Sequence, residues 1–80
     1  MRLDKYLKVS RIIKRRTVAN VACDAGRVTV NGRVARASLD IKANDIIEIS
    51  FGTKTVKVQV LNVAETVRKD DAETLYKIIE

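Results

Sequence analysis

The spacing of apolar residues predicts a short helix at the start of the chain. Leu3, Tyr6 and Leu7 recur at i, i+3 and i+4, which places them on one face of a helix over residues 2–9. Charged residues occupy the remaining faces of this segment. We expect the apolar face to enter the core and the charged faces to stay accessible to solvent or to a ligand.

A second helix is predicted over residues 17–25. Thr17 is a good N-cap, and Gly26 suits the left-handed position that follows a helix. Between them apolar residues recur at i, i+3, i+4 and i+7, and we expect this stripe to pack in the core. The stripe consists of Val18, Val21, Ala22 and Ala25.

Strands are predicted in the middle of the chain, where apolar and polar residues alternate with a period of two. Residues 28–30 and 33–35 flank Asn31-Gly32, the dipeptide most typical of a two-residue hairpin turn. Further strands are expected over residues 46–51 and 56–60. Because strands that follow one another through short turns pair in opposite directions, the sheet should be mainly antiparallel.

A short C-terminal helix is expected to close the fold. Asp70, with Glu73 three residues later, resembles a capping box. The residues that would form its apolar face are Ala72, Leu75, Tyr76 and Ile79. The fold class is therefore α+β, and 80 residues suffice for one domain over residues 1–80 with a small core.

Positive charge is concentrated at one end of the chain. Residues 1–36 hold ten Lys and Arg against two Asp, a net charge of +8, whereas residues 37–80 hold six against eight Asp and Glu, a net charge of −2. A basic half beside a mildly acidic half indicates a polyanion as partner. Four cations fall within residues 11–16, where they repel one another unless an anion neutralises them, so phosphate binding is favoured there.

The remaining cations of the first half allow two interpretations. Arg2, Lys5 and Lys8 form either a solvated helix face or part of a ligand surface. Arg27, Arg33 and Arg36 extend the basic surface onto the predicted hairpin. The three aromatic residues, Tyr6, Phe51 and Tyr76, all fall on predicted core faces, which favours recognition of the nucleic-acid backbone over base stacking. Composition does not distinguish RNA from DNA.

The residues needed for other classes of function are scarce. There is no His and a single Cys, Cys23, which we interpret as an ordinary semi-buried side chain. Without a zinc-ligand cluster, a phosphate-cradling glycine loop or a deep pocket, no enzyme activity, metal or cofactor is expected. The N-terminus lacks a signal-peptide pattern and no apolar run is long enough to span a bilayer, so a cytoplasmic location without membrane contact is expected.

Several adjoining motifs resemble those of one known family. The stretch RLDKYLKVSRIIKRRTVANVACDAGRVTVNG, residues 2–32, followed by Ser38 and by IKANDIIEI, residues 41–49, closely resembles the S4 RNA-binding domain. This resemblance implies two N-terminal helices packed on a small sheet, with RNA held by the basic helix–turn–helix face. Matched by position, it suggests as RNA contacts Arg2, Arg11, Lys14, Arg15, Arg16 and Thr17. Asp4 also belongs to the motif, and we expect it to orient neighbouring cations.

The short chain is most similar to stand-alone bacterial members of that family that act in ribosome-associated quality control. The resemblance implies binding to stalled 50S ribosomal subunits that carry peptidyl-tRNA, with contacts to large-subunit rRNA and tRNA. It also implies action beside a larger RqcH-type tailing factor during alanine tailing, and a monomer off the ribosome. The alternatives are a heat-shock-type rescue factor, the RNA-recognition module of an RNA-modifying enzyme, and a general duplex-binding protein.

Overall fold

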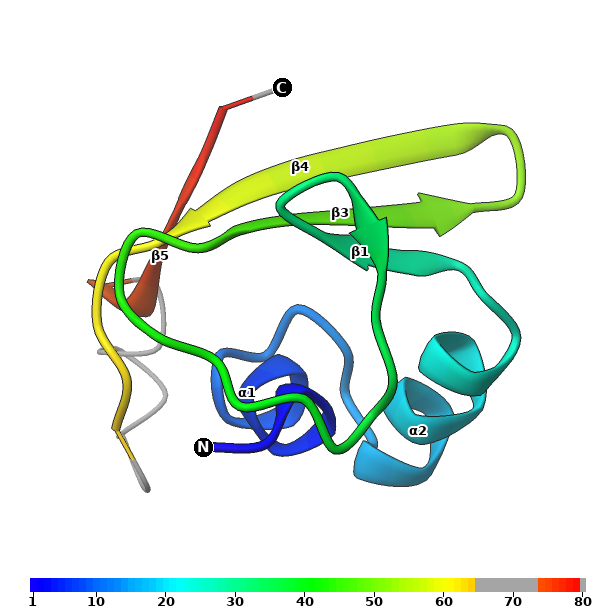
Figure 1. The fold of residues 1–80 in the computed structure, drawn as a ribbon, viewed down its shortest axis with the longest axis horizontal. Helices are drawn as coiled ribbons and strands as arrows, with labels where there is room; N and C mark the ends of the chain where they lie inside the picture. The colour runs from blue at the N-terminus through cyan, green and yellow to red at the C-terminus, as the bar shows by residue number, and fades with distance from the viewer. Residues whose placement is uncertain (65–73, 80) are drawn as a thin grey trace.

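The computed structural model describes residues 1–64 and 74–79, which form two helices and a five-stranded sheet. The helices are α1 (Leu3–Val9) and α2 (Arg16–Asp24). The strands are β1 (Val28–Val30), β2 (Arg33–Val34), β3 (Ile46–Phe51), β4 (Lys54–Val60) and β5 (Tyr76–Ile78). The strand order is β2-β1-β3-β4-β5 and every neighbouring pair is antiparallel. Both helices lie on one side of the sheet (Figure 1), which confirms the predicted α+β class.

The hairpin of β1 and β2 forms where the sequence predicts it. Asn31 and Gly32 both adopt positive φ, at 53° and 83°, as the tight turn requires. The Asn31 side chain also fixes the neighbouring strand, because its Oδ1 accepts a hydrogen bond from the backbone N–H of Ile46 at 3.0 Å. The turn residue therefore joins β1 to the start of β3 as well as reversing the chain.

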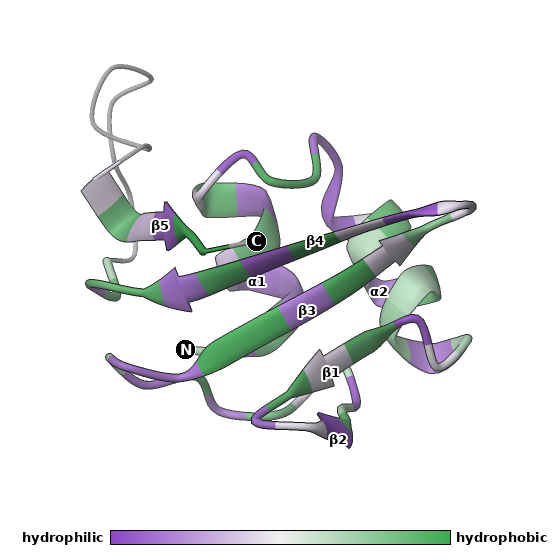
Figure 2. Ribbon diagram, turned by 90° about the horizontal axis from the view of Figure 1, so that it is seen from above, coloured by the Kyte–Doolittle hydropathy of each residue, from purple (hydrophilic) through white to green (hydrophobic). Residues whose placement is uncertain are grey.

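The core lies between α1 and the inner face of the sheet. The three apolar residues of the predicted first helix, Leu3, Tyr6 and Leu7, are fully buried. They face the alternate positions of the central strands, seen as green stripes along β3 and β4 in Figure 2. Those inward positions are Val28, Ile47, Ile49, Val58 and Val60, all fully buried. This pattern confirms the alternation read from the sequence.

The second helix is placed differently from the prediction. Its buried residues are Ala19 and Cys23, whereas Val18 and Val21 are 52% and 67% exposed. Because α2 packs only along a narrow line against α1 and β1, two small side chains at i and i+4 fill the contact. The expectation that the whole stripe forms core is therefore wrong: Val18, Val21 and Ala25 are exposed, and only Ala22 packs, half-buried, against the core. Cys23 is buried, and burial raises the pKa of its thiol to about 11.

The predicted C-terminal helix is wrong over its described part. Tyr76–Ile78 form β5, which pairs with β4 in the register Val58 to Ile78 and Val60 to Tyr76. The edge of β4 would otherwise leave its backbone N–H and C=O groups unpaired, and pairing there outweighs the helical spacing of four apolar residues. Asp70 and Ala72 lie outside the described residues. Phe51, at the β3–β4 turn, is exposed and does not lie on a core face as predicted. Within the described ranges, neither helix is long and apolar enough to cross a membrane.

Replacing Tyr6 with Phe should destabilise the protein without changing its fold. The Tyr6 hydroxyl donates a buried hydrogen bond of 2.7 Å to the backbone oxygen of Leu75, which ties α1 to the segment before β5. Loss of that bond should lower the free energy of unfolding by about 0.5–1.5 kcal/mol, measured by urea denaturation. The control is Tyr76→Phe, at a half-buried position on the sheet. An equal loss in both variants would contradict the role assigned to the Tyr6 bond.

Candidate RNA-binding surface

The carboxylate of Asp4 joins the N-terminal turns of the two helices. Its side chain is only 3% exposed, yet it accepts hydrogen bonds from Arg2, which precedes α1, and from Arg16, the first residue of α2. The Arg2 Nε and Nη2 atoms lie 3.2 and 3.4 Å from its two oxygens, and the Arg16 Nη2 and Nε atoms lie 3.5 and 3.4 Å away. One buried acid therefore holds two guanidinium groups side by side.

Further hydrogen bonds keep this carboxylate charged. Burial alone would raise the pKa of Asp4, but hydrogen bonds from Asn20, Arg16, the backbone N–H of Lys5 and Arg2 together lower it below the ordinary value. The two Arg side chains remain 50% and 48% exposed. Each guanidinium thus has part of its donor set committed to Asp4 and part available for an external anion such as phosphate. The expectation that Asp4 orients neighbouring cations is confirmed.

The connection between the helices presents further cations beside this pair. Arg11, Lys14 and Arg15 are all exposed in it. Arg11 adopts φ of 63°, a left-handed conformation that favours glycine. The N-cap of α2 is Arg15, which makes no side-chain capping bond. Thr17, the predicted N-cap, is instead the second residue of the helix. The free N–H groups of that first turn add a site for negative charge next to the Arg residues.

A shallow apolar depression adjoins the Arg pair. It is lined by Asp4, Arg16, Thr17, Asn20 and Val21. The exposed Val21 of α2 thus borders the predicted basic surface instead of filling the core. Such a surface suits RNA, because its phosphate groups could contact the cations while a sugar or base contacts Val21.

The other predicted contact residues are spread more widely. Lys8, Arg27 and Arg33 are exposed, whereas Lys5 is half-buried on α1. In the described part of the chain, no hydrogen bond or ion pair connects Arg27 or Arg33 with the Asp4 cluster. The structure therefore gathers Arg2, Arg16 and Thr17 at one place and leaves the two hairpin cations outside it.

Asn20 belongs to the cluster but is not predicted from the sequence. Its Nδ2 donates to Asp4 Oδ2 at 3.3 Å, one turn along α2 from Arg16. The position i+4 from Arg16 is the available signal, because such residues share a helix face. Without knowledge that Asp4 lies opposite that face, the sequence shows only that Asn20 stands three residues after Thr17, where a capping box would have Glu.

Comparison with known proteins identifies the family of the part of the chain that forms this surface. Residues 1–47 match the S4 domain family. That stretch contains both helices together with Asp4, Arg2, Arg16 and Asn20. The chain belongs to the S4 domain family.

Relatives over nearly the full chain carry a more specific name. The chain is 58% identical to the RQC P-site tRNA stabilizing factor of Halalkalibacterium halodurans, covering 98% of this chain and 89% of the relative. It is 57% identical to the protein of that name from Streptococcus pneumoniae, covering 99% and 90%. Among solved structures, the trimeric heat shock protein 15 of Vibrio cholerae superposes with a TM-score of 0.90 at 26% identity, covering 98% of this chain and 80% of that one.

Replacing Asp4 with Asn should lower stability and change its dependence on pH. Because the folded-state pKa of Asp4 is depressed, its charge stabilises the fold above the unfolded pKa of about 3.9, and this contribution is lost as pH falls through the lower folded value. At neutral pH the variant should lose roughly 1–3 kcal/mol. The difference in stability should begin to shrink as pH falls below about 4 and should be lost once the pH is below the folded pKa of Asp4.

Urea unfolding followed by circular dichroism from pH 3 to pH 7 measures both effects. The matched control is Asp24→Asn, which removes an exposed carboxylate at the other end of α2. A constant difference between wild type and Asp4→Asn across this range would contradict a charged Asp4 as the stabilising species.

Proposed function

We propose that this protein binds stalled large ribosomal subunits and stabilises the tRNA in the P site during ribosome-associated quality control. The observation that carries the proposal is the pair of half-exposed guanidiniums that Asp4 holds together at the start of both helices. The names of the relatives supply the process and the tRNA. Arg2 and Arg16 would contact RNA phosphates, with Arg11, Lys14, Arg15 and Thr17 extending that contact.

The finer parts of the proposal concern the partners. The RNA surface would contact large-subunit rRNA and the peptidyl-tRNA, while a larger RqcH-type factor supplies alanyl-tRNA for tailing. Off the ribosome the protein would be a monomer in the cytoplasm. The chain performs no chemistry in this scheme, and its contribution is to hold tRNA in a position from which the nascent chain can be extended.

The alternatives have weaker support. A heat-shock-type rescue factor corresponds to relatives near 26% identity, well below the 57–58% of the quality-control factors. An RNA-recognition module of an enzyme would have relatives named for that enzyme, whereas these relatives are named for stabilising tRNA. A general duplex-binding protein would bind random DNA and ribosomes with similar affinity.

A reconstituted tailing reaction tests the function directly. Large subunits carrying peptidyl-tRNA are incubated with alanyl-tRNA and an RqcH-type factor, with and without this protein. Tail length is then read on a gel. We expect longer alanine tails with the wild-type protein and no gain with the Arg2→Ala/Arg16→Ala double variant. Tails that are equally long without the protein would refute the proposal.

Removing both Arg side chains should weaken large-subunit binding and its dependence on salt. Each lost phosphate contact should reduce the slope of log affinity against log salt by roughly 0.7–0.9. Binding is measured by sedimentation at several salt concentrations. The matched control is Lys54→Ala, an exposed cation at the β3–β4 turn. An unchanged slope in the double variant would show that these side chains do not meet phosphate.

Position 11 separates stability from binding. The left-handed conformation of Arg11 costs roughly 1–2 kcal/mol for a residue with a side chain, partly offset because glycine orders at a greater entropic cost. Arg11→Gly should therefore leave the free energy of unfolding unchanged or raise it by up to about 1 kcal/mol, while weakening large-subunit binding. Arg11→Ala should weaken binding equally without that gain. Binding equal to wild type in both variants would remove Arg11 from the surface.

A further inference from the structure

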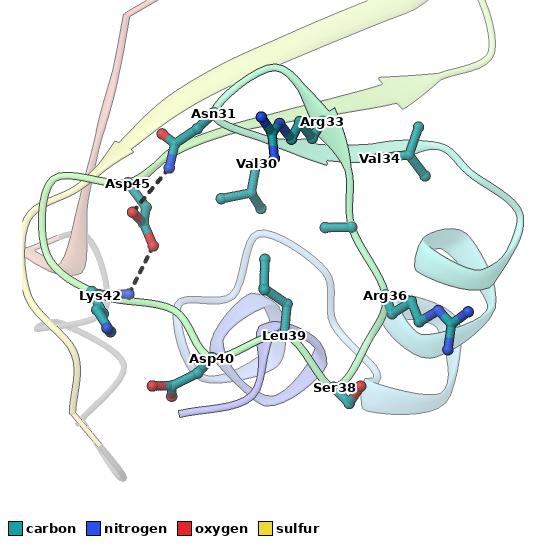
Figure 3. Close-up of a pocket in the computed structure, with 11 residues that line it drawn as sticks. Val30, Asn31, Arg33, Val34, Arg36, Ser38, Leu39, Asp40, Lys42 and Asp45 are labelled. Carbon is teal, nitrogen blue, oxygen red and sulfur yellow. Dashed lines mark hydrogen bonds between the residues drawn. The ribbon is translucent and has the colours of Figure 1, made fainter.

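An open groove lies between the β1–β2 hairpin and the segment that leads to β3 (Figure 3). It has a volume of about 770 Å³, within the roughly 300–1,000 Å³ typical of ligand sites. Val30 and Leu39 point toward one another across it. Val30 and Ala35 are buried beneath, while Leu39 and Val34 are 40% and 67% exposed along its sides. The groove therefore offers an apolar surface that solvent reaches.

The charges around the groove favour an anion. Its two carboxylates already have partners: Asp40 pairs with the α-amino group of Met1 at 2.6 Å, and Asp45 accepts from the Asn31 side chain and the Lys42 backbone at 3.1 and 2.9 Å. In residues 1–64 and 74–79, Arg33 and Arg36 form no salt bridge, whereas Lys42 interacts electrostatically with Asp40 at a longer distance than a salt bridge. The unpaired guanidinium groups of Arg33 and Arg36, beside apolar side chains, suit phosphate joined to sugar and base.

The groove lies close to the start of α1, where Asp4 holds the Arg2–Arg16 pair. The segment that forms one of its sides also packs against the start of α1, because Leu3 N–H donates to Leu39 O at 2.8 Å and Asp4 N–H donates to Ala37 O at 3.1 Å. Arg36 extends from this segment toward the side on which α2 lies (Figure 3). The backbone of residues 37–39 is thus a ridge with the Arg pair on one side and the groove on the other.

We propose that this groove binds unpaired nucleotides of the RNA whose phosphates meet Arg2 and Arg16, an inference that rests on the proposed function. A strand leaving the Arg pair crosses the ridge at Ser38 and enters the groove. Leu39 and Val34 contact ribose and base, Arg36 contacts the phosphate at the ridge, and Arg33 and Lys42 contact phosphates beyond it. The protein therefore prefers a paired RNA element that has a single-stranded extension.

Two labelled RNAs test this preference: a blunt hairpin, and the same hairpin with four unpaired uridines at one end. We expect wild-type protein to bind the extended RNA about tenfold more tightly in fluorescence anisotropy, because phosphate and apolar contacts are added. The Arg36→Gln/Leu39→Ser variant should bind both RNAs alike. The matched control, Lys54→Ala/Phe51→Ala, removes one exposed cation and one exposed apolar side chain at the β3–β4 turn and should retain the tenfold preference.

The outcomes separate this inference from the proposed function. The Arg2→Ala/Arg16→Ala variant should bind both RNAs more weakly, and the ratio of its two affinities should stay near ten. Equal wild-type binding of both RNAs would overturn the groove proposal and leave the function standing, whereas wild-type binding of neither would count against both. Photo-crosslinking on the ribosome from Leu39→p-benzoylphenylalanine should label RNA. Crosslinks to protein alone would make the groove a protein contact and overturn the inference.

Discussion

The hydrogen bonds of the buried Asp4 carboxylate with Arg2 and Arg16 are the interaction on which the candidate RNA-binding surface depends. A charge removed from water is stable only when it is compensated, and here Arg2, Arg16, Asn20 and the Lys5 N–H provide that compensation. The same bonds fix the positions of two long side chains that would otherwise sample many rotamers. An RNA phosphate that binds them then meets groups already ordered, so less conformational entropy is lost on binding.

The sequence is a good guide wherever one face of an element must be buried. The first helix, the Asn31-Gly32 hairpin and β3 all form as predicted, because their apolar spacing and turn chemistry agree with the tertiary contacts. Asp4 and the Arg cluster are also found from the sequence, through the family motif. The distances between these residues cannot be read from the sequence, because Arg2 and Arg16 are fourteen positions apart and meet only when both helices have packed.

Two predictions fail for reasons that local pattern cannot reveal. The apolar stripe of α2 has helical spacing, but α2 contacts its neighbours along a line that only Ala19 and Cys23 fill, which leaves Val18 and Val21 exposed beside the RNA surface. The apolar residues Ala72, Leu75, Tyr76 and Ile79 have helical spacing too, yet Tyr76–Ile78 pair with the edge of β4 as β5. In each case the outcome depends on which element the segment packs against or pairs with, and the spacing of apolar residues does not show that.

Backbone hydrogen bonds and one buried side chain hold the ridge formed by residues 37–39 in place. Leu39 O and Ala37 O accept hydrogen bonds from the first residues of α1, and the Ala37 side chain is buried in the core, whereas Ser38 and Leu39 are exposed. Substitutions at Ser38 or Leu39 can therefore change what the groove accepts without moving Arg2 or Asp4. If the Arg pair binds phosphate and the groove binds nucleotides as proposed, substitutions in the groove would change the selectivity for RNA while the phosphate contacts stay the same.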